Sequence, residues 1–182
     1  MRAEAGKRAA LVFSLLDANK DGVLEEADFA LMADRLAGAA DRSTAEAKTV
    51  MRAALSRYWE TLLTSLDSDG NGVISISEFT ACVLSPERFK TMVTAVADAV
   101  AGLSDHDGSG RVERGYLRKL LASINIDPSS SDAMFDALGP DEQDSVRTDR
   151  WNESVRDFYD PEKFDIPVDL LVLGRRGKAP DA

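Results

Sequence analysis

The sequence predicts an all-α protein of four helix–loop–helix units, arranged in two pairs whose neighbouring loops are joined by short strands. A 12-residue loop pattern recurs, beginning at residues 17, 67, 105 and 139 of the 182. The first two loops also share an apolar frame, with a Leu directly before each loop and Phe29 or Phe79 directly after it. Apolar residues at helical spacing flank the loops. Such a repeat defines the architecture, because each unit buries its apolar face only against a neighbour.

The periodicity predicts the elements in chain order. The expected helices are 2–16, 25–37, about 44–66, one that begins at Pro86, one that ends at Ser123, and 132–138. Ser43 or Thr44 is a suitable cap for the long third helix. Pro86 suits the first turn of a helix. Ile74, at position 8 of its loop, is expected in a short strand that pairs with the neighbouring loop.

The units divide the chain into two halves and a tail. We expect one pair in residues 1–84, with loops 17–28 and 67–78, and a second pair in 85–160, with loops 105–116 and 139–150. The break between the pairs is short, so they should pack as one compact body. The tail, 161–182, contains an apolar stretch from Phe164 to Leu173. We expect it to pack on that body, with binding of a partner as the alternative.

The second loop has the strongest pattern for a cation site. Its candidate ligands are Asp67, Asp69 and Asn71 at positions 1, 3 and 5, the Val73 carbonyl at position 7, Ser75 at position 9 and Glu78 at position 12. Gly72 at position 6 permits a positive φ where the chain must turn sharply. Alternating oxygen ligands closed by a bidentate Glu are the ligand set of a calcium loop. A solvated acidic turn would not require so many correlated positions.

The first loop repeats this ligand set with one change. Its candidate ligands are Asp17, Asn19 and Asp21, the Val23 carbonyl, and Asp28 at position 12. Asp is one methylene shorter than Glu and favours one oxygen over two. Magnesium accepts octahedral coordination, whereas calcium takes six to eight oxygens. We therefore expect this loop to bind calcium, but with less preference for calcium over magnesium than the second loop has.

The third and fourth loops are weaker. The third offers Asp105, Asp107, Ser109, the Arg111 carbonyl and Glu113, but Tyr116 at position 12 is a neutral phenol. We expect a weak site there. The fourth has Gly139 at position 1 and the fixed positive charge of Arg150 at position 12. Its acids at 141, 142 and 144 are interpreted as out of register, so we expect a silent loop kept as a strand partner.

Composition narrows the function classes. The net charge is −10, which disfavours nucleic acid and anionic membranes as partners. No apolar run is long enough to span a membrane, and the N-terminus is not typical of a secretion signal. Cys82 and His106 are the only residues of their kinds, which leaves no plausible catalytic set, so we expect no enzyme. We expect Cys82 to be buried and the protein to be a cytoplasmic monomer.

The chain resembles the calerythrin and sarcoplasmic calcium-binding group of EF-hand proteins. The residues that carry the resemblance are Glu26-Ala27-Asp28-Phe29, the approach Val100-Ala101-Gly102-Leu103-Ser104-Asp105, and the closing Val155-Arg156-Asp157-Phe158. The resemblance implies a compact protein of four EF hands that binds calcium and either buffers it or senses it. The chain departs from calerythrin in its loops, since its second loop is intact and its fourth is lost.

Buffer and sensor are the two functions in contest. A sensor opens on binding and exposes a Met-rich groove to a protein target. The five Met residues here are scattered, and the apolar tail is long enough to cover a groove. We therefore favour a buffer, with a sensor that acts on a protein target as the alternative. A secreted calcium-dependent adhesion module is disfavoured by the long helices and by the lack of an export signal.

Overall fold

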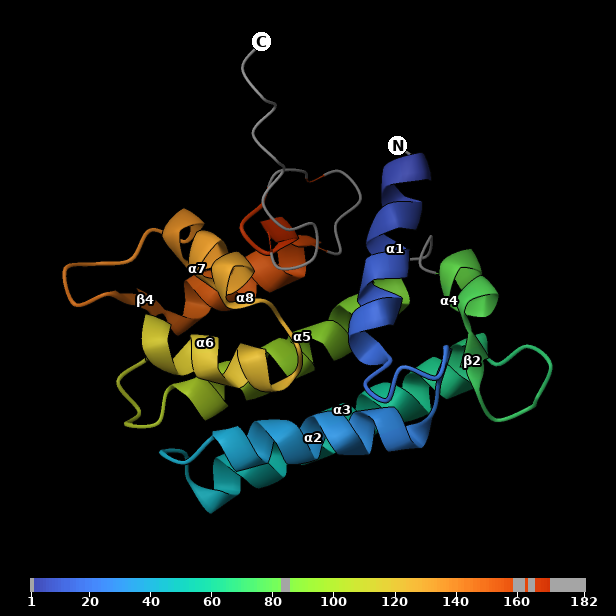
Figure 1. The fold of residues 1–182 in the computed structure, drawn as a ribbon, viewed down its shortest axis with the longest axis horizontal. Coiled ribbons are helices and arrows are strands. Elements are labelled where there is room, and N and C mark those ends of the chain that lie inside the picture. The colour runs from blue at the N-terminus through green and yellow to red at the C-terminus, as the bar shows by residue number, and fades with distance from the viewer. Residues whose placement is uncertain (1, 83–85, 159–162, 164–165, 171–182) are drawn as a thin grey trace, which may run out of the picture.

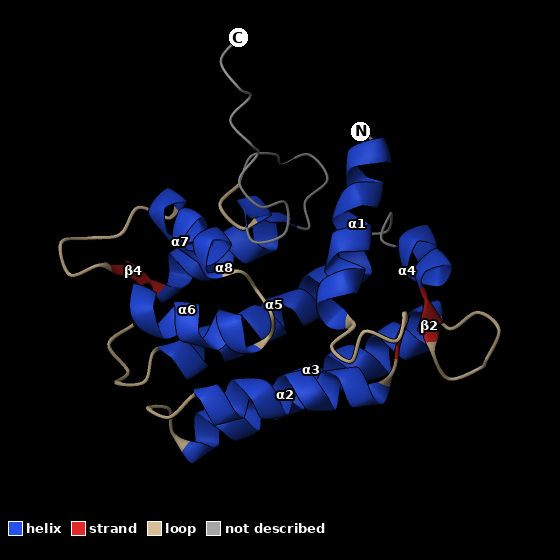
Figure 2. Ribbon diagram, in the orientation of Figure 1, coloured by secondary structure: helices blue, strands red, loops and turns tan. Residues whose placement is uncertain are grey.

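The structure, a computed structural model, describes residues 2–82, 86–158, 163 and 166–170. These residues form helices and four very short strands (Figures 1 and 2). In order they are α1 (Arg2–Leu16), β1 (Val23–Leu24), α2 (Glu26–Ala39), α3 (Ala45–Leu66), β2 (Ile74–Ser75), α4 (Ile76–Cys82), α5 (Pro86–Ser104), β3 (Arg111–Glu113), α6 (Arg114–Ser123), α7 (Pro128–Ala137), β4 (Ser145–Arg147) and α8 (Thr148–Phe158). The predicted all-α fold is confirmed.

Local sequence signals explain where the helices begin. Thr44 caps α3, since its side chain accepts a hydrogen bond from the Ala47 N–H (3.1 Å). Asp127 caps α7 in the same way, with Pro128 in the first turn. The expected helix at 132–138 therefore begins four residues earlier than predicted. The prediction took the helix start from the apolar periodicity, whereas the Asp127 cap and Pro128 determine the observed start.

The strands join the loops in two antiparallel pairs. Leu24 faces Ile74 where β1 meets β2, and Val112 faces Val146 where β3 meets β4. All four residues occupy position 8 of their loops, and each is at most 2% exposed. The position-8 side chains thus anchor each pair of loops to the core, and Ile74 lies in a strand paired with the neighbouring loop as predicted.

The two pairs share one core. A continuous cluster of buried apolar side chains contains residues from Ala9 to Val168. α3 packs against α5, and α2 packs against both α3 and α6, so the elements of the two halves interlock (Figure 1). Phe29 lies at the centre of the first half, with its ring 5.4 Å from Trp59 and 5.7 Å from Tyr58. The division at residue 84 stays a prediction.

Part of the tail lies within the described residues. Val168 is buried in the shared core, and its N–H donates to Ser154 Oγ (3.2 Å) on α8. Ile166 and Leu170 pack against the same core. The rest of the predicted apolar stretch lies outside the described residues, as do the surroundings of Cys82. No helix in the described part of the chain is both long and apolar enough to cross a membrane.

Candidate metal centre

Three of the loops have the same internal scaffold. Position 6 is a glycine with positive φ in each, and its N–H donates to the carboxylate at position 1. These bonds are Gly22 to Asp17 (3.1 Å), Gly72 to Asp67 (3.0 Å) and Gly110 to Asp105 (2.9 Å). A side chain at these φ values would be strained, so the glycines allow the turn that brings later ligands back toward position 1. The first, second and third loops are therefore built alike up to position 6.

In the second loop the backbone turns the candidate ligands inward. Asp67 Oδ1 accepts the N–H groups of Gly70 (2.8 Å) and Asn71 (3.1 Å). Asp69 Oδ1 accepts from Asn71 (3.1 Å), and Asn71 Oδ1 accepts from Val73 (2.9 Å). Each side chain thus bonds a backbone donor further along its own loop, which fixes the loop's curl.

Glu78 closes the second loop from the first turn of α4. Its Oε1 accepts the N–H (3.0 Å) and hydroxyl (2.8 Å) of Ser68, and its Oε2 accepts the N–H (2.9 Å) and hydroxyl (2.8 Å) of Ser75. These bonds, led by those from the Ser75 and Ser68 backbones, lower the pKa of Glu78 to about 2. The side chain therefore reaches from position 12 back to position 2 as a fully ionised carboxylate.

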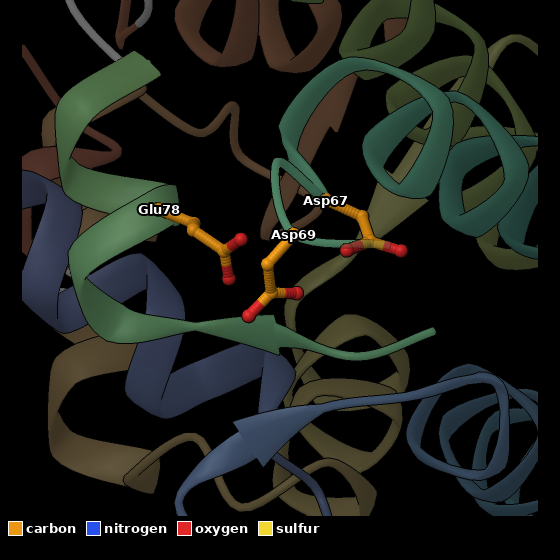
Figure 3. Close-up of side chains that lie close together, drawn as sticks. All are labelled: Asp67, Asp69 and Glu78. Atoms are coloured by element: carbon orange, nitrogen blue, oxygen red, sulfur yellow. The ribbon is translucent and has the colours of Figure 1, made fainter. Parts of the chain in front are cut away.

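Carboxylates converge in the second loop. Asp67, Asp69 and Glu78 each place a carboxylate oxygen within 4.8 Å of the others. Figure 3 shows Glu78 and Asp69 pointing toward one another, with Asp67 beside Asp69 at the end of α3. Within the described part of the chain, no other group of three acidic, His or Cys side chains meets this spacing. Like charges so close repel one another, and a hard divalent cation bound by these oxygens would relieve that repulsion.

The first loop holds its position-12 carboxylate more deeply. Asp28 is fully buried, and its oxygens accept the N–H groups of Asn19 (3.0 Å) and Glu25 (2.9 Å). Asp17 is 6% exposed. Asn19 Nδ2 bonds Asp21 Oδ2 (2.8 Å), and Asn19 Oδ1 accepts the Asp21 N–H (2.9 Å). The predicted ligands therefore lie in one loop, although their carboxylates are not as tightly grouped as those of the second loop.

The third loop differs at its end. Asp107 Oδ1 accepts the Ser109 N–H (3.1 Å), as a position-3 residue should. Glu113, at position 9, pairs instead with Arg42 from the first half (2.7 Å), and that bond lowers the pKa of Glu113. Tyr116 is 4% exposed and directs its hydroxyl to Arg42 and Ser43, away from a ligand role. Position 12 therefore serves a contact between the halves.

The fourth loop contains built-in cations. Arg111, from the third loop, pairs with Asp141, and its Nε donates to Ser145 Oγ (2.7 Å). Asp141 Oδ1 also accepts the N–H groups of Gln143 and Ser145 (both 3.0 Å), so Asp141 acts as a position-3 residue. The interpretation of Asp141 as out of register is therefore wrong. The guanidinium of Arg150 lies beside Gly139, where a Cβ would be 3.4 Å from Arg150 Nη1.

Sequence reasoning missed three residues that shape these loops: Ser68, Arg42 and the side chain of Arg111. Ser68 occupies position 2, a place with no ligand role, and only its Glu78 partner reveals its importance. Arg42 lies 71 residues from Glu113 along the chain. The sequence indicated only the Arg111 carbonyl as a ligand. A basic residue in a strand that pairs with an acidic loop could have predicted the ion pair to Asp141.

The comparisons with known proteins agree with this geometry. The family model for the EF hand matches residues 60–84, which contain the second loop. The search of curated proteins finds no match. A solved calcium-binding protein of Streptomyces coelicolor, associated with prokaryotic calcium-mediated regulation, is similar in structure. It has a TM-score of 0.72 and 20% identity over 85% of this chain and 97% of that one.

Photoproteins share the fold as well. Clytin has a TM-score of 0.70 with 14% identity over 93% of both chains. Magnesium-loaded apo-berovin, from a ctenophore, has a TM-score of 0.66 with 17% identity over 84% of this chain and 86% of that one. This chain therefore has the fold of EF-hand calcium-binding proteins, and the predicted resemblance is confirmed at that level.

Proposed function

We propose that this chain is a calcium buffer that acts inside the cell, with its strongest site in the second loop. The observation that carries the proposal is the convergence of Asp67, Asp69 and Glu78 within 4.8 Å in a loop that the EF-hand family model matches. The remaining ligands would be Asn71, the Val73 carbonyl and Ser75, directly or through water. Six or more oxygens at one loop suit calcium.

The first loop is the second site of the proposal, and the third is weaker. The short Asp28 side chain at position 12 favours fewer ligand oxygens, which magnesium tolerates. Berovin, a protein of the same fold, binds magnesium in its calcium-binding loops. In the third loop the ligands would be Asp105, Asp107, Ser109 and the Arg111 carbonyl, while Glu113 is held by Arg42. That loop would need water molecules to complete the shell of the ion.

Buffering is favoured by the small number of large apolar side chains that are exposed in the described part of the chain. Among the residues whose side-chain burial the structure describes, the exposed large apolar side chains are Val50 on α3 and Ile76 on α4. Val168 of the tail is already packed into the core. A protein that orders on binding calcium without opening would keep this surface.

A sensor is the second candidate. It is favoured by one comparison, since the Streptomyces coelicolor protein of the same fold is associated with calcium-mediated regulation. A sensor would expose apolar surface to a protein target when calcium binds.

An exposed-hydrophobicity dye separates the two candidates. The intact chain and an Asp67→Asn/Glu78→Gln double variant are titrated with calcium in the presence of the dye. A buffer gives little change or a fall in fluorescence in the intact chain, and truncation before Phe164 raises the signal. A large calcium-dependent rise in the intact chain, absent in the double variant, supports the sensor. An intact chain that releases no binding heat with calcium contradicts both.

A further inference from the structure

The segment Ala40–Thr44, between α2 and α3, lies against the third loop of the other half (Figure 1). We call this segment the α2–α3 linker. It joins the outgoing helix of the first EF hand to the incoming helix of the second. The linker and the direct packing of α2 on α3 therefore both bear on the angle between those two helices.

Tyr116 bonds this linker with its hydroxyl. The oxygen accepts the Arg42 N–H (3.1 Å) and lies 2.8 Å from Ser43 Oγ. Ser43 Oγ in turn donates to the carbonyl of Leu103 (2.5 Å), at the end of α5. The Tyr116 ring lies 5.2 Å from the Arg42 guanidinium and packs edge-on against His106. A buried hydroxyl with these partners holds the linker in one position, because leaving them unpaired is costly.

Two ion pairs join the same elements. Arg42 pairs with Glu113 at 2.7 Å, and Lys119 on α6 pairs with Asp41 at 2.7 Å. Both pairs are about half exposed, so each contributes little by itself. The Arg42 pair matters more for geometry, because it directs Glu113, the position-9 residue of the third loop, toward the linker. Both Glu113 oxygens contact the Arg42 guanidinium, at 2.7 and 3.4 Å, so Arg42 competes with a cation for this carboxylate.

We propose that Tyr116, Glu113 and Arg42 form a latch that couples cation binding in the third loop to the position of α2 and α3. With the latch closed, Tyr116 at position 12 provides no ligand to the third loop. Arg42 also competes with the cation for Glu113 at position 9. A cation that recruits Glu113 releases Arg42 and loosens the linker. By linkage, movement of α2 and α3 that opens the latch strengthens cation binding at the third loop. The ion-binding half of this inference rests on the proposed function.

The test is a calcium titration of the full chain by amide NMR. Gly72 and Gly110 each donate to the position-1 carboxylate of their loops, so their amide shifts report the second and third loops separately. Tyr116→Phe removes the hydroxyl without a charge change, and Arg42→Gln removes the ion pair at an exposed position. Either variant should lower the calcium concentration at the Gly110 midpoint by about fivefold or more. The Gly72 midpoint should not move.

The matched control is Lys163→Gln, which also removes one positive charge and one ion pair, to Asp157, at a position outside the linker and outside both pairs of loops. Gly110 midpoints that move no further in the two latch variants than in this control overturn the proposal. So does a Gly110 amide that responds to calcium in none of the variants.

Failure of the proposed function has a different signature. A Gly72 amide that never responds to calcium contradicts the calcium site itself. The latch is then judged on the Arg42 amide, whose hydrogen exchange should be about tenfold faster in Tyr116→Phe because the amide has lost its acceptor. Unchanged exchange at Arg42 overturns the latch even if every loop binds calcium.

Discussion

The second and third loops share a frame up to position 6 and then diverge at position 12. Glu78 folds back over its own loop and accepts four hydrogen bonds from Ser68 and Ser75. Tyr116, in the equivalent position, turns outward and bonds the linker of the other half. The difference shows that the side chain at position 12 can either close its own loop or bond a distant segment of the chain.

The fourth loop extends this comparison. It retains the strand and a positive φ at position 6, where Asp144 replaces glycine. Its acidic position-3 residue, Asp141, is neutralised by the Arg111 guanidinium. The Arg111 guanidinium thus supplies the positive charge that a bound metal ion would otherwise supply, and the third and fourth loops are joined by this ion pair.

The largest effect is expected from Glu78→Gln. The amide removes the negative charge and one acceptor from position 12, so the second loop should bind calcium about tenfold more weakly or worse. Isothermal titration measures the loss. Glu153→Gln, an exposed change of equal charge on α8, is the control and should leave the affinity unaltered. An unchanged high-affinity phase in Glu78→Gln would remove the second loop from the account.

Tyr116→Glu should make calcium binding by the third loop more like that of the second loop. The new carboxylate supplies the missing ligand, but it must leave a buried position to reach the ion, so we expect a gain of about tenfold or less. The gain should be accompanied by faster hydrogen exchange at Arg42, because the linker loses its acceptor. A variant with no added calcium equivalent at any concentration would show that position 12 is not what separates the two loops.

Asp28→Glu tests the difference between the first and second loops. The longer side chain reaches the ion with both oxygens, so the ratio of calcium to magnesium affinity should rise by a few-fold, on the order of three. Competition titrations measure the ratio, with exposed Asp98→Glu on α5 as the control. A ratio that stays flat or falls would mean that the buried bonds of Asp28, and not its length, set the selectivity.

Arg111→Met tests the built-in cation of the fourth loop. Both groups of the Arg111–Asp141 pair are about one-third exposed, so we expect a loss of about 1 kcal/mol or less in the free energy of unfolding. The loss should be the same with and without micromolar calcium, a level at which the third loop is expected to be empty. Arg118→Met, which breaks a longer pair with Asp132 (3.4 Å), should cost less in chemical denaturation. A calcium-dependent loss would indicate that the fourth loop holds an ion after all.

The repeat predicted most of the fold because its signals are local. The loop starts, the position-6 glycines and the position-8 residues Leu24, Ile74, Val112 and Val146 are read directly from spacing, and the structure buries those four residues. The long-range contacts were not predictable in this way. Tyr116 and Arg42 are 74 residues apart, and nothing near either residue indicates the other. The phenol could be recognised as a poor ligand, but not as a partner of the linker.

The most direct test of the account is a calcium titration in which the Gly22, Gly72 and Gly110 amides are followed separately. All three donate to a position-1 carboxylate, so each reports one loop. We expect the Gly72 amide to shift at about 10⁻⁷ to 10⁻⁵ M calcium. Gly22 should respond over a similar range, and Gly110 only near the millimolar level. A Gly72 amide that does not respond, or a Gly110 amide that titrates together with it, would contradict the claim that position 12 sets the difference between the loops.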